Sequence, residues 1–442
     1  MHKNITKLRI QTYLCSIISG VLIILCAAHS SFADPFSRWN SYWGDLHCHA
    51  KFSADSNCEG FQITPEQFFI NARLNHLDFA ALTEHDAIMG IDDLTPHWER
   101  IKRAAINSSG PLFVGIAGFE WSNNNGALNA TGIDWLYKHR VVLFPHSYGG
   151  PLFQSYKPQY ATTHGFLEAI KNHAPEAVVD NAHPYADFRN LYDVTSSWDY
   201  SLEDAGLKSF IYVTEICRSF NPRGESPDPF FNFEKSINKA LSSISSGGKL
   251  FIKPGFIGVS DVPHDGHPGN NCLTCLYADE LTDRGIFDAL RKKRSYATSG
   301  PRMIIKFWAV SPNLTEHIMG EEFQVNPAEI VTFSWEIITS SFPEHAISEI
   351  DIISNDSVIW KEIFPLPNNR DNGSYSVTIL SDDYFYLRII QTNGHAGWSS
   401  PIYISTHTSV PVLSKLIIPV IVLSITMVIA FFLYLLYLLR FN

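Results

Sequence analysis

Six short apolar runs, separated by helix-like stretches, are the feature that most constrains the fold between Tyr42 and Arg302. One of these stretches opens with Thr64-Pro65-Glu66, which combines an N-cap residue, a proline at the first helical position and an acidic first turn. It predicts a helix that continues to about Asn75. Strands that alternate with helices predict an α/β region with a parallel sheet, closed or open. The predicted buried strands are Phe79–Leu82, Leu112–Ala117, Val141–Phe144, Ala177–Val179, Ile211–Val213 and Phe256–Val259.

The pattern of apolar residues changes after Arg302, where they begin to alternate with polar ones. Turn residues such as Pro367-Asn368-Asn369 separate the alternating segments. This pattern predicts a second, all-β region over residues 303–406, folded as a small antiparallel β-sandwich-like unit of about 100 residues. The alternating segments are Val331–Trp335, Tyr375–Ile379, Tyr384–Ile390 and Pro401–Ile404.

Both ends of the sequence carry apolar segments of different kinds. A basic segment, residues 3–9, precedes an apolar stretch, residues 13–28, and a small-residue cleavage pattern that ends at Ala33. This order predicts a secretory signal over residues 1–33, with an uncleaved anchor as the alternative. The uncharged apolar segment Leu416–Leu439 is long enough to cross roughly 30 Å of hydrocarbon as a transmembrane helix. The ends together predict a single-pass membrane protein whose bulk is exported, periplasmic or extracellular.

The formal net charge of -11 limits the classes of partner that we expect. Surfaces that coat nucleic acids are basic, so no nucleic-acid partner is expected. A small substrate that carries a phosphate stays compatible with this charge, because a metal ion can supply positive charge locally.

Cysteine spacing gives a weaker indication. Cys272 and Cys275 form a C-x-x-C pair, and the sequence has no second such pair. The spacing therefore leaves both a structural zinc site and a local disulfide open.

The segment Gly44-Asp45-Leu46-His47-Cys48-His49 gives the clearest chemical signal. On a strand, residues i and i+2 point to the same face. We therefore expect the imidazoles of His47 and His49 to point towards one place while Cys48 faces away. Asp55, eight residues after His47, lies within reach after a turn.

Further histidines and carboxylates stand next to the predicted strands, most of them directly after a strand. In a parallel barrel, the carboxyl ends of the strands meet at the rim that holds the active site. Clustered buried charges are costly unless something pairs them, and several metal ions would do so. The residues that follow a strand are Glu84, His85, Glu120, His183, Glu215, Asp261, His264 and His267, and His139 precedes the strand at Val141–Phe144.

This series of motifs resembles the PHP (polymerase and histidinol phosphatase) superfamily over Tyr42 to Arg302. Three further motifs resemble its DUF3604 branch, namely Tyr42 to His47, Arg294 to Gly300 and Gly394 to Pro401. The resemblance implies a distorted TIM-like (β/α)7 barrel of PHP type over residues 42–302. The metal ligands that it implies are His47, His49, Asp55, His85, Glu120, His139, His183, Asp261 and His264.

The sequence departs from the superfamily pattern at two of its motifs. The T-D-H motif is Thr83-Glu84-His85 here, and we expect Glu84 to orient His85 through a hydrogen bond. The final D-x-H motif has one extra residue, which leaves His267 as the alternative to His264. His146, which follows the same strand that His139 precedes, is likewise the alternative to His139.

The resemblance also implies two or three divalent metal ions, and imidazole and carboxylate ligands suit Zn, Mn or Fe. Such ions lower the pKa of bound water towards roughly 7 and supply a nucleophile for hydrolysis. We expect Glu120 to bridge metal ions, and Asp261 to bridge or to handle protons. Arg218 and Arg294 are candidates for binding the substrate.

A small-molecule phosphoester is the expected substrate class. The first alternative is a metal-dependent hydrolase of a non-phosphate ester or an amide. The second is a surface binding module in which the metal site is structural, because structural sites are coordinatively closed whereas catalytic sites keep a position for water.

Overall fold

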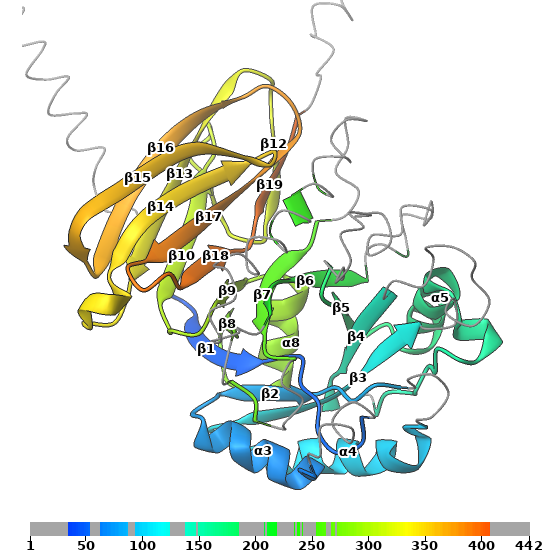
Figure 1. Ribbon diagram of the computed structural model, residues 1–442. Helices are drawn as coiled ribbons and strands as arrows, with labels where there is room; N and C mark the ends of the chain where they lie inside the picture. Colours follow the sequence, from blue (N-terminus) through cyan, green and yellow to red (C-terminus); the bar gives the residue numbers. More distant parts are fainter. Residues whose placement is uncertain are drawn as a thin grey trace, which may run out of the picture.

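The computed structural model describes residues 34–53, 62–86, 93–123, 138–146, 149–184, 207, 210–218, 234, 237–238, 241, 253–261, 267–269 and 272–406. Within these residues, nine strands of the first region pair in the order β9-β8-β1-β2-β3-β4-β5-β6-β7 (Figure 1). All six predicted strands are present. The bounds are β1 (Asn40–Asp45), β2 (Phe79–Leu82), β3 (Val114–Asn123), β4 (Lys138–Phe144), β5 (Val178–Asn181), β6 (Ile211–Arg218), β7 (Gly255–Val259), β8 (Leu273–Ala278) and β9 (Ser295–Thr298).

The predicted (β/α)7 barrel is wrong. Such a barrel has parallel strands, each followed by a helix, whereas β4 runs antiparallel to both β3 and β5, and β8 runs antiparallel to both β1 and β9. An apolar run such as Val141–Phe144 indicates a buried strand but not its direction, and for this reason β4 was misread as parallel. Among the described strands of the first region, the parallel pairs are β1–β2, β2–β3, β5–β6 and β6–β7.

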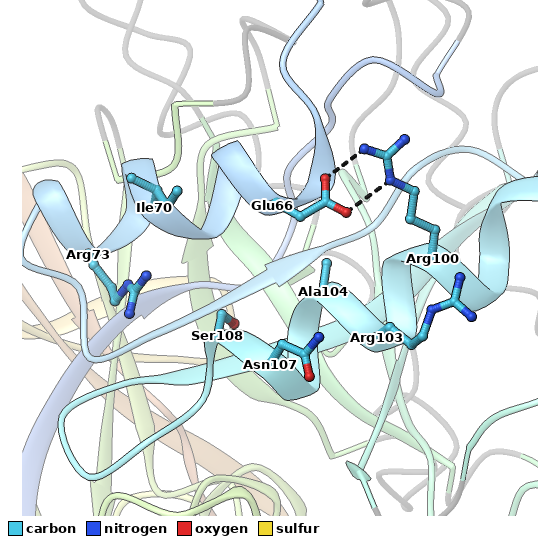
Figure 2. Close-up of a pocket in the computed structure, with 8 residues that line it drawn as sticks. All are labelled: Glu66, Ile70, Arg73, Arg100, Arg103, Ala104, Asn107 and Ser108. Atoms are coloured by element: carbon cyan, nitrogen blue, oxygen red, sulfur yellow. Dashed lines mark hydrogen bonds and ion pairs between the residues drawn. The ribbon is translucent and has the colours of Figure 1, made fainter.

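Four α-helices occur among the described residues, and they pack against the sheet and against one another. Thr64 caps the first of them by accepting a hydrogen bond from the backbone N–H of Gln67, as predicted. The first two helices lie side by side, and Arg100 donates two hydrogen bonds, of 2.9 and 2.8 Å, to Glu66 across them (Figures 1 and 2). The helices are α3 (Pro65–Leu74), α4 (Thr95–Ser108), α5 (Thr163–His173) and α8 (Asp283–Arg291).

The strands after Arg302 are antiparallel with one exception, the parallel pair β12–β19. Strand β18 pairs with β9, with Trp398 opposite Ala297, so the large sheet continues from the first region into the second. A four-stranded sheet faces this extension, and the rings of Phe333 and Phe385 lie 4.5 Å apart between the two sheets. The four-stranded sheet contains β10 (Ile304–Val310), β11 (Glu316–Ile318), β13 (Glu329–Ile338) and β16 (Arg370–Ile379). The extension contains β12 (Glu322–Val325), β14 (Ile347–Ser354), β15 (Ser357–Asn368), β17 (Asp383–Gln391), β18 (Ala396–Ser399) and β19 (Ile402–Thr406).

The expected single-pass membrane location is also corrected. No helix among the described residues is long and apolar enough to cross a membrane. The longest, α4, has 14 residues, against the roughly 20 that a span needs. The segments on which the expectation rested, residues 1–33 and 416–439, lie outside the described residues.

A disulfide joins Cys217 on β6 to Cys272, which directly precedes β8. Cys275 is a buried free thiol on β8, so the local Cys272–Cys275 disulfide does not form. The bond therefore links two strands that lie far apart in the sequence, rather than closing a short turn.

Candidate metal centre

Histidines and carboxylates on or next to seven strands, β1 to β7, come together at one rim of the sheet. Because β4 is antiparallel to its neighbours, its first residues lie where β3 and β5 end. This reversal explains why His139 precedes its strand while the other histidines follow theirs. Each member of the rim is 6% exposed or less: His47, His49, His85, Glu120, His139, His183, Glu215 and Asp261.

Four side-chain atoms at the centre of the rim form a first cluster. The Nε2 atoms of His47 and His49 lie 3.1 Å apart. The Oε2 atom of Glu120 lies 3.1 Å from the first and 3.2 Å from the second. The Oδ1 atom of Asp261 lies 3.5 and 3.1 Å from the same two nitrogens. His47 and His49 come after the end of β1 rather than within the strand, yet their rings converge as expected.

The spacing of the first cluster fits one metal ion. Four ligands arranged tetrahedrally at zinc-like distances of about 2.0–2.1 Å would lie about 3.3 Å from one another. The five separations given above, 3.1 to 3.5 Å, surround this value. Direct packing of two imidazole nitrogens against two carboxylate oxygens would leave uncompensated negative charge in a buried place.

Hydrogen bonds from behind fix which nitrogen of each ring faces the cluster. The Nδ1 atom of His47 donates to Oε1 of Glu215 at 2.6 Å. The Nδ1 atom of His49 lies 2.9 Å from the hydroxyl of Ser53, which itself donates to Glu84 at 2.6 Å and so accepts from the ring. A ring that donates through Nδ1 presents its Nε2 lone pair to the cluster, as a metal ligand must.

Glu120 connects the first cluster to a second one. Its Oε1 atom lies 2.6 Å from Nδ1 of His139 and 2.9 Å from Nε2 of His183. Its Oε2 atom, already part of the first cluster, lies 3.0 Å from Nδ1 of His85. His85, Glu120 and His139 form a second group whose atoms lie close enough to hold an ion. This position suits a bridging carboxylate, and that role stays a prediction.

The electrostatics of the rim favour added positive charge. Burial alone would raise the pKa of Glu120, but the neighbouring His85, His47 and His139 hold that pKa well below its usual range. Burial would lower the pKa of His47, but Asp261, Glu120 and Glu215 raise it well above its usual value. A proton and a metal cation therefore compete for the same buried place.

The pKa of His139 is shifted in the opposite direction from that of His47. Burial lowers the pKa of its imidazole to about 4 and outweighs the attraction of Glu120. Its ring is therefore neutral at physiological pH and has a lone pair to offer. Neutral imidazole is the form that binds metal ions.

Two of the rim residues have strained backbones. His183 has φ +26° and Asp261 has φ +50°, values that residues other than glycine seldom adopt. The backbone N–H of Asp261 donates to the carbonyl of His47 at 2.8 Å, which holds this conformation in place. Strain of this kind tends to occur where a site needs a particular side-chain direction.

A third group shares His47 with the first, and one of its members, Asp180, was not predicted from the sequence. It contains His47, Glu215 and Asp180, a buried residue of β5 whose carboxylate oxygens have no hydrogen-bond partner among the described residues. Burial, and then the nearby Glu215, raise the pKa of Asp180 well above its usual range. The signal for Asp180 was its place three residues before His183, inside an otherwise apolar strand.

Glu84 is connected through Ser53 to two histidines, because the Ser53 hydroxyl lies 2.9 Å from Nδ1 of His49 and accepts from the backbone N–H of His85 at 3.0 Å. It accepts hydrogen bonds from the backbone N–H of Ala50 at 2.9 Å and of Phe52 at 3.0 Å, as well as from Ser53. Through Ser53 it reaches His49, and it fixes the chain that follows that residue. Sequence reasoning had no signal for this connection, because Ser53 belongs to no motif.

The two arginines predicted to bind substrate lie in different places. Arg218 donates from Nε to Oδ2 of Asp261 at 2.7 Å, and its side chain is 22% exposed beside the buried cluster. Arg294 is buried at the other end of β1, where it donates to the carbonyl of Tyr277 and to Asp288. The structure therefore brings Arg218 to the rim and leaves Arg294 away from it.

Four predicted site residues remain. Asp55 and His264 lie outside the described residues. His267 is exposed and belongs to none of the three groups found among the described residues. His146 lies beyond the other end of β4, and its Nε2 atom is 2.6 Å from the carbonyl of Gly115. The structure thus places His139, and not His146, at the rim.

A separate surface hollow of about 400 Å³ lies between α3 and α4 (Figure 2). Arg73, Arg100, Arg103 and Glu66 are among its lining residues. The hollow contains none of the rim residues, so changes at Arg103 or Glu66 leave the rim unaltered.

Comparisons with known proteins bear on the family. The sequence model of DUF3604, described as a protein of unknown function, matches residues 259–329. This match confirms the resemblance to DUF3604.

Three chlamydial proteins are similar to this chain in sequence. An uncharacterized protein of Chlamydia pneumoniae is 24% identical over 410 residues, which cover 86% of this chain and 60% of that protein. An uncharacterized protein of Chlamydia trachomatis is 27% identical over 144 residues, which cover 30% of this chain and 22% of that protein. The matches therefore span three fifths or less of the length of these relatives.

Among solved structures, the chain is similar to a two-domain protein from Bacteroides vulgatus that contains a predicted PHP-like metal-dependent phosphoesterase. The TM-score is 0.44 and the sequence identity 14%, and the match covers 83% of this chain and 96% of that one. In the present chain, the buried groups of histidine, glutamate and aspartate fit a metal-dependent hydrolase that uses divalent cations.

Proposed function

We propose that this DUF3604-like chain is a metal-dependent hydrolase and that its substrate is a small phosphoester. The observation that carries the proposal is the first cluster: two imidazole nitrogens and two carboxylate oxygens separated by 3.1 to 3.5 Å. Hydrogen bonds from Glu215 and Ser53 turn the nitrogen lone pairs inwards. A divalent cation is the species that such an arrangement stabilises.

The residues suit two ions. His47, His49, Glu120 and Asp261 would hold the first, and His85, Glu120 and His139 the second, with His183 beside Glu120. The donors are nitrogen and oxygen, and no cysteine joins the three groups found among the described residues. This donor set suits Zn, Mn or Fe.

Bound ions would supply an acidic water as the nucleophile, with a pKa near 7, and would stabilise negative charge on substrate oxygens. The chain's own residues set the geometry for this chemistry. Glu120 spans the two clusters with its two oxygens, so it fixes their separation. Asp261 faces His49 with Oδ1 and is held through Oδ2 by Arg218. Asp261 therefore lies between the first cluster and the partly exposed guanidinium of Arg218.

The substrate class follows from Arg218 together with the PHP resemblance. A guanidinium that binds Asp261 through Nε has further N–H groups with which to bind an anionic oxygen. The net charge of -11 argues against a nucleic-acid substrate and is compatible with a small phosphoester.

The test uses the full chain, purified without chelator. Metal per chain is measured by elemental analysis, and hydrolysis is assayed on aryl phosphomonoesters, phosphodiesters, carboxylic esters and amides. The double variant His47→Ala, His49→Ala is compared with His164→Ala, which removes a histidine that is 57% exposed on α5.

Two or more ions per chain, and phosphoester hydrolysis lost only in the double variant, are the expected result. Hydrolysis confined to carboxylic esters or amides would keep the hydrolase and replace the substrate class. A chain that binds metal tightly without hydrolysing any of the substrates would favour a structural site in a binding module. A chain that binds no Zn²⁺ or Mn²⁺ would overturn the proposal.

A further inference from the structure

Glu215 contacts two members of the rim with its two carboxylate oxygens. Its Oε1 atom accepts from Nδ1 of His47 at 2.6 Å, and its Oε2 atom accepts from the backbone N–H of His183 at 2.5 Å. The side chain is fully buried, so solvent cannot replace either bond. No motif of the sequence assigns a role to this residue.

The two contacts connect residues that follow strands which are not neighbours in the sheet. His47 follows β1, whereas His183 follows β5, and three strands lie between β1 and β5 in the sheet order. Glu215 lies on β6, next to β5. A single carboxylate therefore sets the distance between rim residues that no shared backbone ladder connects.

Each contact has a separate chemical effect. An ionised carboxylate only accepts hydrogen bonds, so Nδ1 of His47 must hold a proton and its Nε2 atom is left to face His49, Glu120 and Asp261. The second bond holds the backbone of His183, whose φ of +26° is unfavourable for a residue with a side chain. Without it, the His183 ring would lose its direction towards Glu120.

We infer that Glu215 is a positioning residue, which fixes the tautomer of His47 through the ring and the direction of His183 through the backbone. The inference deepens the proposed metal centre and rests on it for its use, although the two hydrogen bonds can be tested without metal. The change Glu215→Gln keeps the size of the side chain but offers one acceptor oxygen and one donor NH₂ group. Only one of the two partners can then keep its bond.

The first readout is NMR of the full chain with ¹⁵N-labelled histidine, without added metal. We expect a slowly exchanging proton on Nδ1 of His47, assigned by its loss in His47→Asn, and we expect it to be absent in Glu215→Gln. The matched control is Glu66→Gln, which makes the same change at the surface bridge to Arg100 (Figure 2). An unprotonated Nδ1 in the unmodified chain, or an unchanged signal in Glu215→Gln, would overturn the inference.

The second readout is the affinity for Zn²⁺, measured by competition with a chromogenic chelator. Loss of a residue that orients ligands weakens metal binding by about 10- to 100-fold, and Glu66→Gln should leave the affinity unchanged. Equal zinc affinity in Glu215→Gln and the unmodified chain would overturn the positioning role. An unmodified chain that binds no zinc but shows the Nδ1 proton would remove the metal-centre proposal and still support the bond from Glu215 to His47. If Glu215→Gln fails to fold, the Nδ1 signal of the unmodified chain decides alone.

Discussion

The Nε2 atoms of His47 and His49 lie 3.1 Å apart, and each ring is held from behind by a hydrogen bond at Nδ1. Two neutral imidazoles held in this way turn lone pairs towards each other. Only a proton or a metal ion between them makes the arrangement favourable. The remaining rim residues are therefore best tested by changes that alter metal binding without altering the fold.

Glu120→Gln should reduce the metal content and the activity more than any change behind the ligands. The amide has one oxygen and one NH₂ group, so it cannot face both clusters as an acceptor. We expect the loss of activity to exceed the 10- to 100-fold typical of residues that only support ligands. Metal per chain and kcat are the measurements, with Glu66→Gln as the control. Full metal content in Glu120→Gln would contradict the bridging position.

Ser53→Ala should weaken metal binding by about 10-fold, through His49 rather than through the ions themselves. The hydroxyl links Nδ1 of His49 to Glu84 by contacts of 2.9 and 2.6 Å. Without it, the ring can take either tautomer. Zinc titration measures the effect, and Ser108→Ala on α4 is the control because its hydroxyl donates within that helix. A zinc affinity that stays the same would show that Glu84 fixes the backbone and leaves the ring free.

Arg218→Met should lower kcat/KM for anionic substrates by about 10- to 100-fold, the range for loss of a hydrogen bond to a charged group. The change removes the donor to Asp261 and a guanidinium that is partly exposed beside the buried cluster. Arg103→Met, in the surface hollow between α3 and α4, is the matched control. An equal loss for neutral esters would mean that Arg218 acts through Asp261 alone, with no contact to substrate.

Reducing the disulfide between Cys217 and Cys272 should lower the free energy of unfolding by about 4 kcal/mol, from loop-closure entropy in the unfolded chain. The bond spans a sequence separation of 55 residues. Urea unfolding of the double variant Cys217→Ser, Cys272→Ser gives the value. Added reductant should not change the free energy of unfolding of the variant. It should lower the free energy of unfolding of the unmodified chain to the value of the variant. A reductant effect that persists in the variant would point to another disulfide.

The stability of the chain relative to Lys293→Met should rise between about pH 8 and pH 10.5. Burial lowers the pKa of Lys293 to about 8, and the attraction of Glu322 only partly opposes this. The folded state thus favours the neutral amine. Below pH 8 the buried charge lowers the free energy of unfolding, and this penalty disappears as the pH rises towards the pKa of lysine in the unfolded chain. The difference is at most about 3 kcal/mol. Parallel pH profiles of unfolding for both chains would contradict the shift.

Sequence reasoning located the strands well because buried strands are short apolar runs. It gave β2 as Phe79–Leu82, the same bounds as in the structure. It did not predict the direction of β4 relative to its neighbours, because an apolar run has the same pattern in a parallel and in an antiparallel strand. The barrel prediction fell on this point, and the parallel pairs that remain do not make a (β/α)7 barrel.

The candidate site was easier to predict in its ligands than in their supports. His47, His49, His85 and His183 stand in short motifs next to strands, and the structure brings them together. Ser53 belongs to no motif, and the signal for Asp180 is only its place three residues before His183. Arg294 was misplaced for the opposite reason: its motif is distinctive, but its guanidinium is bound to Tyr277 and Asp288.

The pairing of β18 with β9 has a practical consequence for dissecting the chain. A fragment that ends at Arg302 would leave the backbone N–H and C=O groups of β9 unpaired along one side. An open sheet edge of this kind recruits other chains and promotes aggregation. The second region thus covers this edge of the first, and we expect a fragment that lacks it to aggregate.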